Sequence, residues 1–375
     1  MVNCPVLGII SSVVGVNQAL SHLLVNLSFL IPKPTGLATY AKNIFPHLTD
    51  LNPTLLVADT IPGYHCHRVP ANMNPDAGKW GHLKRLLWTQ FRLPSVYQRS
   101  RASLLFSPIP EAPLQSNCRH VVTVHDLIPL RFPRRFSPLI PYHRYYIPQV
   151  LREAEHIICD SEATGKDIVD FLQIPARKIT PVPLAYDASH FRFLDLPTQN
   201  YFFYIGRHDA YKNLSRLVAA FAKIVRLGEC QLWIAGPNDS RYTLQLQQQA
   251  EALGISQQVK FVGYIDYDQL PKVLNQALAL VFPSLWEGFG LPILEAMACG
   301  TPVVTSNISS MPEVAGDAAL LVNPYETEEI AEAMKAIATD SQLRSRLRVA
   351  SLQRSSQFSW EKTGNQTASV LQQFC

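Results

Sequence analysis

The sequence predicts an α/β protein made of two Rossmann-like domains, each built on a doubly wound parallel sheet. Three observations support this fold class. Short apolar runs alternate with helix-like segments along most of the chain. The second half repeats strand and helix with short connections, as βαβ units do. A chain of 375 residues is also long enough to form two separate cores.

Composition places the chain among globular proteins, because 47% of its residues are apolar and 17% are charged. The seven cysteines are scattered, odd in number and form no C-x-x-C pair. This pattern indicates reduced thiols and argues against a zinc site. We therefore expect a cytoplasmic protein, with peripheral association at the inner face of a membrane left open.

Residues 1–20 are expected to form an N-terminal extension of unknown role. No charged side chain occurs in residues 1–32, but Asn17, Gln18 and Ser21 interrupt the apolar run. A spanning helix needs about twenty mainly apolar residues, and a signal peptide needs a basic segment ahead of its apolar run. An upstream start and a weak membrane anchor are the alternatives.

The first domain is expected over residues 21–184. Apolar runs predict its strands at residues 22–30, 54–58, 103–106, 120–124, 156–160 and 178–182. A Pro/Gly turn ending at Gly36 leads into a helix through about Leu48, and this glycine either starts the helix or lets backbone approach a ligand. Asp160 or Ser161 is expected to cap the helix after strand 156–160.

The second domain is expected over residues 200–358, after a linker at 185–199 that follows the prolines at 181 and 183. Its predicted strands cover residues 201–205, 231–235, 259–262, 278–282, 302–305 and 319–322. Ser359 is a plausible cap for a last helix.

The most informative stretch follows the strand at 278–282. Gly288 and Gly290 bracket a tight turn, and Pro292 stands where a first helical residue would. Free backbone N–H groups at such a helix start favour an anion. Glu287 lies in the loop and Glu295, eight residues later, in the expected first turn of the helix. They are either a solvated acid and an acid complementing the helix dipole, or acceptors for sugar hydroxyls beside a bound phosphate.

Two other strands end in polar groups, where ligands bind in open α/β sheets. Gly206, Arg207 and Lys212 follow the strand at 201–205. The two cations could hold phosphate oxygens or could simply be exposed in a loop. His125 and Asp126 follow the strand at 120–124, where a buried or loop histidine is the alternative to a ligand contact.

The D-x-D sequence formed by Asp266 and Asp268 could hold a divalent metal. It precedes an apolar helix, so a helix cap is the preferred interpretation and no metal site is expected.

The first half carries a basic segment. Between His65 and Arg101 there are seven lysines and arginines against one acid, whereas residues 201–330 carry eight against thirteen. Trp and Leu residues interleave with the cations, as in an amphipathic helix at a membrane surface. The apolar side chains are Trp80, Leu83, Leu86, Leu87, Trp88 and Phe91. Ordinary surface variation is the alternative, and no nucleic-acid module is recognisable.

Three of these patterns match a known family. The Glu287–Glu295 pair with its surrounding run resembles the E-x7-E signature of glycosyltransferase family 4, which comprises retaining enzymes of the GT-B fold. The resemblance implies that the two domains face each other across a cleft. The Gly-Arg…Lys-Asn and His-Asp-Leu-Ile-Pro sequences are similar to that family's diphosphate clamp and sugar-contacting histidine. The resemblance covers roughly residues 22–372. It also implies that a last helix, at 359–375, packs back on the first domain.

The resemblance implies the site residues. Arg207 and Lys212 would neutralise the diphosphate, Glu295 would bind the ribose, and the sugar would lie between Glu287 and His125. The implied catalytic residues are His125, Arg207, Lys212 and Glu287. The implied donor-binding residues are Gly36, Gly206, Arg207, Lys212, Gly263, Glu287, Phe289, Gly290, Leu291 and Glu295.

The implied activity is transfer of a hexose, with mannose favoured, from GDP-mannose or a UDP-sugar to a glycan or lipid-linked acceptor in polysaccharide biosynthesis. No metal or other cofactor is expected. A sugar phosphorylase or epimerase on the same scaffold, or a catalytically silent GT-B partner subunit, is the alternative.

Overall fold

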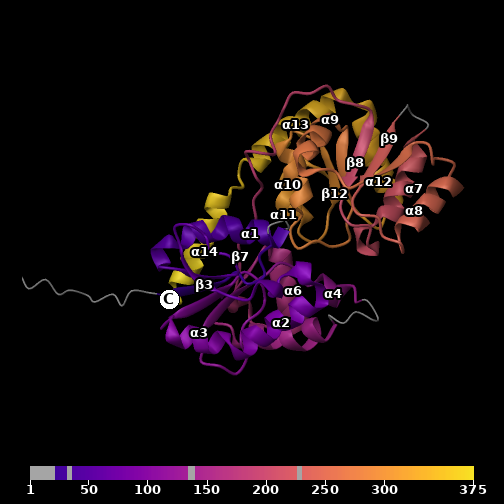
Figure 1. Ribbon diagram of the computed structural model, residues 1–375. Helices are drawn as coiled ribbons and strands as arrows, with labels where there is room; N and C mark the ends of the chain where they lie inside the picture. Colours follow the sequence, from indigo (N-terminus) through magenta and orange to yellow (C-terminus); the bar gives the residue numbers. More distant parts are fainter. Residues whose placement is uncertain (1–21, 32–35, 134–139, 226–229) are drawn as a thin grey trace, which may run out of the picture.

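A computed structural model of the protein describes residues 22–31, 36–133, 140–225 and 230–375 (Figure 1). Two parallel sheets, each covered by helices, form two lobes that lie one above the other. The predicted extension at residues 1–20 lies outside the described residues.

The first lobe contains a seven-stranded sheet with the order β3-β2-β1-β4-β5-β6-β7, and all its strand pairs are parallel. Its central strands are buried throughout, which explains why they are continuous apolar runs in the sequence. The strands are β1 (Leu23–Asn26), β2 (Thr54–Val57), β3 (His65–Arg68), β4 (Leu104–Ser107), β5 (His120–Val124), β6 (His156–Cys159) and β7 (Ile179–Pro181). The α-helices are α1 (Gly36–Ile44), α2 (Gly78–Phe91), α3 (Leu93–Arg99), α4 (Ile128–Arg131), α5 (Ile147–Glu153) and α6 (Glu162–Leu172).

The second lobe contains a six-stranded sheet with the order β10-β9-β8-β11-β12-β13, also entirely parallel. The strands are β8 (Tyr201–Ile205), β9 (Gln231–Ala235), β10 (Val259–Gly263), β11 (Ala279–Phe282), β12 (Val303–Ser306) and β13 (Leu320–Val322). The helices that follow are α7 (Leu214–Ile224), α8 (Thr243–Ala252), α9 (Leu270–Gln276), α10 (Leu291–Ala298), α11 (Met311–Ala315), α12 (Thr327–Thr339), α13 (Ser341–Ser355) and α14 (Trp360–Gln372).

These strand orders give each sheet a topological switch point. The chain leaves β1 to one side towards β2 and returns to β4 on the other, and β8 is flanked by β9 and β11 in the same way. Ligands bind at the carboxyl ends of strands at such points. The two-domain α/β prediction is therefore confirmed, and the candidate residues follow strands beside the switch points.

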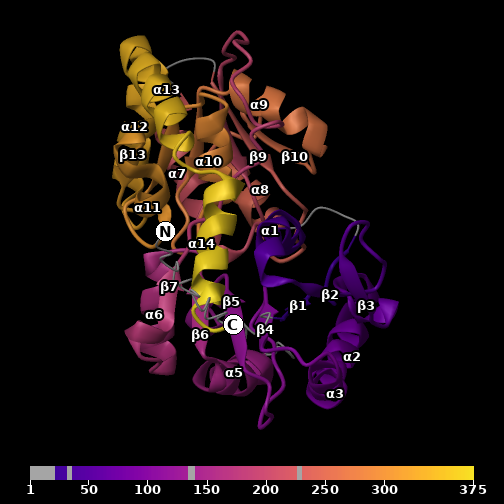
Figure 2. The ribbon, with the colours of Figure 1, turned by 90° about the vertical axis from the view of Figure 1, so that its left-hand side faces the viewer.

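The last helix, α14, runs from the second lobe down to the first (Figure 2). The side chain of Ser359 caps it, as predicted, by accepting the N–H of Lys362. Thr363 Oγ1 donates to the carbonyl oxygen of Pro183 at 2.8 Å. Gly364 has no side chain, and a Cβ there would lie 2.3 Å from the ring of His47. The chain end thus ties the two lobes together.

Strand β3 was not predicted, because its residues His-Cys-His-Arg are polar and largely exposed at the edge of the sheet. An edge strand that carries charged side chains has no apolar run to reveal it. The predicted basic, tryptophan-containing segment does form a helix, α2.

Two local predictions around the second sheet are wrong. Helix α10 begins at Leu291, so Glu295 is its fifth residue and lies beyond the first turn. An acid there cannot be explained by the helix dipole, whose effect is confined to the first turn. The side chain of Asp266 makes no cap hydrogen bond to the short helix at Tyr267–Gln269.

Candidate active site

The loop after β11 lies directly against the first lobe. A Cβ atom at Gly288 would lie 2.1 Å from the carbonyl oxygen of His125 and 3.1 Å from Cβ of Asp126. Only glycine therefore fits between the end of β11 and the end of β5. Because of this contact, the polar residues that follow these two strands belong to one site.

Lys212 and Glu287 form an ion pair in this loop region. The Lys212 ammonium donates to Oε1 of Glu287 at 2.6 Å, and only about a tenth of each side chain is exposed (12% and 10%). The residues are 75 positions apart in sequence, so the structure brings together two groups that sequence patterns identified separately. Lys212 also lies 5.2 Å from the ring centre of Tyr211.

Two serines hold the backbone of the Glu287 loop. Ser309 Oγ accepts the N–H of Glu287 and donates to its carbonyl oxygen, at 3.1 and 2.9 Å. Ser310 Oγ contacts the carbonyl oxygens of Glu287 and Phe289, at 3.0 and 2.7 Å. The loop conformation is therefore fixed by side chains of the segment after β12, which the sequence did not single out.

Arg207 lies at the edge of the same site. Its Nε donates to Asp209 at 3.0 Å, and 61% of its side chain is exposed. Gly206, just before it, has φ +151°, and a Cβ there would lie 2.7 Å from the hydroxyl oxygen of Tyr204. The glycine is thus required by the turn that presents Arg207.

Glu295 is set apart from these charges. Burial raises the pKa of its carboxyl to about 7. Among the residues that the structure describes, none forms an ion pair or hydrogen bond with this carboxylate. A carboxylate held without a partner is energetically costly, which is typical of a group that meets its partner on a ligand.

His125 is fixed by two acceptors. Its Nδ1 lies 2.8 Å from Asp160 Oδ2 and its Nε2 lies 3.0 Å from the carbonyl oxygen of Pro108. Burial alone would lower the pKa of this histidine, but the Asp160 carboxylate and the Pro108 carbonyl outweigh it and raise the pKa. Both nitrogens therefore face acceptor oxygens, which hold the ring in place. A contact between this ring and a sugar stays a prediction. It requires one ring nitrogen to exchange its present acceptor, on Asp160 or Pro108, for a sugar oxygen.

Side chains at the start of α6, in the first lobe, form hydrogen bonds to Gly288 in the second lobe. Its carbonyl oxygen accepts from Ser161 Oγ at 2.6 Å and from Thr164 Oγ1 at 3.2 Å. Ser161 is also the cap of α6, as predicted. The Glu313 carboxylate, from the second lobe, accepts the N–H groups of Glu162 and Ala163, both at 2.8 Å. The lobes thus share a network that centres on the helix start.

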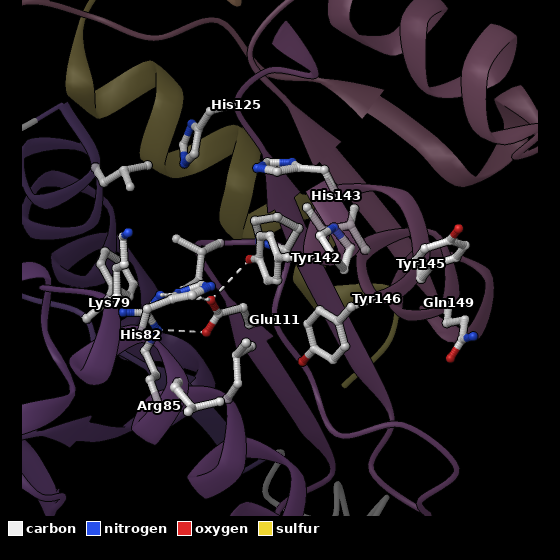
Figure 3. Close-up of a pocket in the computed structure, with 18 of the residues that line it drawn as sticks. Lys79, His82, Arg85, Glu111, His125, Tyr142, His143, Tyr145, Tyr146 and Gln149 are labelled. Carbon is white, nitrogen blue, oxygen red and sulfur yellow. Dashed lines mark hydrogen bonds and ion pairs between the residues drawn. The ribbon is translucent and has the colours of Figure 1, made fainter. Parts of the chain in front are cut away.

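Two cavities meet at this point. One, of about 650 Å³, lies between the lobes and is lined by Arg207 and Tyr211 on one side and by Arg131 and Phe132 on the other. The rings of Phe132 and Tyr211 stack across it at 5.5 Å. A second cavity, of about 1100 Å³, lies in the first lobe below His125 (Figure 3). Asp126 lines both cavities.

The remaining predicted site residues are glycines and backbone donors. Gly290 has φ +112° and immediately precedes α10, so Leu291 is the first residue of that helix and Phe289 is buried behind it. Gly36 begins α1, and Gly263 ends β10 with φ +69°. A Cβ at either position would meet no described atom within 4 Å. The structure is therefore compatible with a ligand near both, and their donor-binding roles stay predictions.

Within the described ranges, no group of three His, Cys, Asp or Glu side chains lies close enough together to hold a metal ion. Asp266 and Asp268 lie within these ranges. Nor does any helix of the described residues have the length and apolar character needed to cross a membrane.

Sequence reasoning missed the residues that orient His125 and connect the lobes. Asp160, which binds His125 within the first lobe, and Ser161 were identified only as candidate helix caps, and Thr164 and Glu313 not at all. Each acts on a residue that is more than thirty positions away, such as the 35 between His125 and Asp160 and the 150 between Ala163 and Glu313. No local pattern signals contacts of this kind.

Comparison with known proteins is consistent with this geometry. A model described as Glycosyltransferase Family 4 matches residues 34–190, and one described as Glycosyl transferases group 1 matches residues 187–354. O-antigen chain mannosyltransferase B of Escherichia coli is 30% identical over 266 residues, 66% of this chain and 69% of that protein. O-antigen chain mannosyltransferase RfbU of Salmonella typhimurium is 27% identical over 327 residues, 84% of this chain and 90% of that protein.

Solved structures share the architecture. Sucrose-phosphate synthase from Thermosynechococcus elongatus superposes with a TM-score of 0.73 at 20% identity, over 94% of this chain and 98% of that one. Anabaena HepE in complex with UDP-glucose gives 0.71 at 17% identity, over 94% and 99%. The fold is therefore GT-B. Together with the sequence relatives and the two matching models, it shows that the chain is a glycosyltransferase that belongs to glycosyltransferase family 4.

Proposed function

We propose that the protein transfers a hexose, with mannose favoured, from a nucleotide diphosphate sugar to a glycan or lipid-linked acceptor, without a metal and with retention of anomeric configuration. The observation that carries this proposal is the buried Lys212–Glu287 pair, beside the glycine at which the two lobes meet. The names of the sequence relatives support mannose. The solved complex of HepE with UDP-glucose supports a nucleotide-sugar donor.

The cations supply the main catalytic effect. When the bond from sugar to diphosphate breaks, negative charge develops on the leaving oxygens, and fixed cations stabilise it. Lys212 has three N–H donors, so it can keep its bond to Glu287 and still bind a phosphate oxygen. The side chain of Arg207 is mostly exposed, and its guanidinium can donate to two phosphate oxygens at once. These charges replace those that a metal would supply.

The carboxylates and backbone hold the remainder of the donor. Glu295, whose carboxylate has no partner among the described residues, accepts the ribose hydroxyls. Glu287 and the first-lobe wall at His125 lie on opposite sides of the sugar, and the start of α10 offers N–H groups to sugar and phosphate. Membership of a family of retaining enzymes favours attack on the face from which the diphosphate leaves.

A donor screen tests the proposal. Purified protein is heated with GDP-mannose, UDP-glucose and UDP-galactose, because a ligand at 100 times its Kd adds about 2.7 kcal/mol of stability. The stabilising donor is then incubated with membrane lipid and glycan acceptors, and the anomeric configuration of the product is read by NMR. Donor turnover that needs inorganic phosphate or no acceptor would favour a phosphorylase or epimerase. Absence of any nucleotide-sugar binding would favour a silent partner subunit.

The pH dependence of donor binding tests Glu295. Because its pKa is about 7, the carboxylate that accepts ribose hydroxyls forms as the pH rises through that value. We expect donor affinity, measured by calorimetry, to rise between about pH 6 and about pH 8 in the wild type. Glu295→Gln is expected to weaken binding about tenfold at the higher pH, the effect of one hydrogen bond to a charged group.

Stability provides the control for this variant. The folded-state pKa of about 7 lies above the ordinary value of 4.5, so the folded protein binds more protons than the unfolded chain between these values. Stability is therefore lost as the pH rises through that interval. Without ligand, Glu295→Gln should be more stable than wild type at about pH 8 and equal to it at about pH 4. Glu251→Gln, on the exposed end of α8, should change neither property. Identical pH profiles for wild type and Glu295→Gln would exclude the role.

We also propose that α2 docks on an anionic membrane surface. Trp80, Leu83, Leu87 and Phe91 lie on one face of the helix and are 73%, 43%, 50% and 70% exposed. Leu86 and Trp88, which the sequence grouped with them, point elsewhere: Leu86 lines the large cavity and Trp88 packs against the core. Arg85 is buried against Glu111, so the surface charge comes from its exposed neighbours Lys79, Lys84 and Arg92.

Vesicle binding checks this surface. The double substitution Trp80→Ser and Phe91→Ser should weaken binding to vesicles of phosphatidylglycerol and phosphatidylcholine by tenfold or more. Each substitution removes an aromatic ring whose burial in the bilayer would contribute about 1.5–3 kcal/mol to the binding free energy. The matched control is Leu244→Ser, which removes a 56% exposed leucine from the second lobe. Equal flotation of both variants with the vesicles would contradict the proposal.

A further inference from the structure

The larger cavity lies wholly within the first lobe, between α2 and the segment 141–149, and its upper end opens at His125 (Figure 3). Its volume is about 1100 Å³. Most of the surface of the wall is apolar, and it includes several hydrocarbon side chains. Those that matter here are Leu37, Leu83, Leu86, Ile109, Leu114 and Ile147. A wall of this kind favours a ligand with a substantial apolar part.

The charges on the floor of the cavity are already satisfied. The Arg85 guanidinium donates two hydrogen bonds to the Glu111 carboxylate, both at 2.8 Å, and a third to the carbonyl oxygen of Met73 at 3.0 Å. The Tyr142 hydroxyl donates to the same carboxylate at 3.1 Å. This network is neutral in sum and fully paired, so it shapes the cavity without attracting an ion.

Two histidines that line the cavity are not satisfied. His82 Nδ1 accepts from the Arg85 guanidinium at 2.8 Å, so the neutral ring carries its proton on Nε2. Nε2 of His82 and Nδ1 of His143 are buried and have no partner among the described residues. Burial lowers the pKa of both rings, to about 4 for His143, so both are neutral. A buried N–H without an acceptor is costly, and a ligand oxygen would relieve it.

The cavity connects the membrane-facing helix to the transfer site. Leu83 lines the cavity and also belongs to the exposed apolar face of α2. Lys79, one turn earlier, lines the cavity and is exposed. At the other end, Asp126 lines both this cavity and the one between the lobes. A molecule in the cavity could therefore extend from the bilayer surface to the sugar.

We propose that this cavity seats a lipid-linked acceptor: its hydrocarbon chain lies along the apolar wall from Leu83, a phosphate oxygen accepts from His82 Nε2 beside Lys79, and its reacting hydroxyl lies at Asp126. The inference rests on the proposed transferase function and narrows its acceptor class to amphiphiles. A purely saccharide acceptor would need many hydrogen-bond partners, whereas the surface of the wall is mainly apolar.

Binding of n-dodecyl phosphate tests the site without requiring turnover. Calorimetry on the full-length protein, below the micellar concentration, should show binding at least about 100-fold tighter than for ethyl phosphate, because each buried methylene adds to affinity. Leu86→Trp, which fills the cavity, should weaken dodecyl phosphate about tenfold or more and leave nucleotide-sugar binding unchanged. Unchanged donor binding also shows that the variant is folded.

The hydrogen bond is tested separately. His82→Phe should weaken dodecyl phosphate about tenfold, whereas His82→Gln, which keeps an N–H donor, should retain most of the affinity. Equal binding of ethyl and dodecyl phosphate, or no effect of Leu86→Trp and His82→Phe, would overturn the proposal. The proposal would also be overturned if a Leu86→Trp variant that no longer binds dodecyl phosphate still transferred sugar to a chain-bearing acceptor at the wild-type rate. Donor binding with no dodecyl phosphate binding would overturn this inference alone, whereas failure to bind any donor would refute the proposed function.

Discussion

Replacing Lys212 with alanine is expected to lower turnover by about 10²-fold or more. Its ammonium lies 2.6 Å from Glu287 and is mostly shielded from water, so its charge acts in a medium of low dielectric constant. Charge that develops on the diphosphate would lose a fixed cation that needs no reorganisation during the reaction. Steady-state kinetics with the donor identified by the screen measure the effect, which should appear in kcat more than in KM.

The same substitution affects stability, and this effect must be separated from catalysis. Removing one partner of a buried ion pair leaves the other uncompensated, which costs up to roughly 3–5 kcal/mol. Adding Glu287→Gln to Lys212→Ala should recover much of that stability without recovering turnover. Lys272→Ala, at an exposed position of α9, is the matched control and should change neither quantity. A Lys212→Ala variant with wild-type kcat would remove this residue from the mechanism.

Replacing Gly288 with alanine is expected to lower kcat/KM by about 10²-fold, the typical cost of misplacing reacting groups by an ångström. The new Cβ would lie 2.1 Å from the carbonyl oxygen of His125, which belongs to the backbone at the end of β5 and cannot rotate away. The lobes would have to separate there. The bonds from Ser161 and Thr164 to the Gly288 carbonyl would then lengthen or break.

Donor binding distinguishes this geometric effect from a folding defect. The proposed contacts to the nucleotide come mainly from the second lobe, so calorimetry should show donor affinity within a few-fold of wild type. Gly165→Ala, in the middle of α6, is the matched control, since its Cβ would meet neighbours only at 3.4 Å and beyond. Equal loss of donor binding and turnover in Gly288→Ala would show that the loop itself, rather than the approach of the lobes, is damaged.

The proposed acceptor site and membrane surface are consistent with each other. The exposed face of α2 would place the opening of the large cavity at the bilayer, and the cavity ends where the lobes meet. Substitution of Trp80 and Phe91, which do not line the cavity, should therefore reduce vesicle binding but not dodecyl phosphate binding, whereas Leu86→Trp should do the reverse. Each property can be lost alone, which allows the two proposals to be judged independently.

The sequence by itself determined the fold class, nearly every strand and two helix caps. Central strands of a parallel sheet are buried on both faces, so they appear as apolar runs that need no partner to be recognised. Caps such as Ser161 and Ser359 act on N–H groups three residues away and are equally local. The resemblance to glycosyltransferase family 4 was also visible in short motifs.

Only the tertiary structure decided how these parts combine. It paired Lys212 with Glu287, fixed both nitrogens of His125, buried Arg85 against Glu111 and left Glu295 without a partner in the part of the chain that the structure describes. It also placed polar β3 at the edge of a sheet. Propensity and periodicity act over a few residues, whereas these contacts join positions from 17 to 75 apart in the chain. Their energies depend on burial and distance, which exist only once the two sheets have packed together.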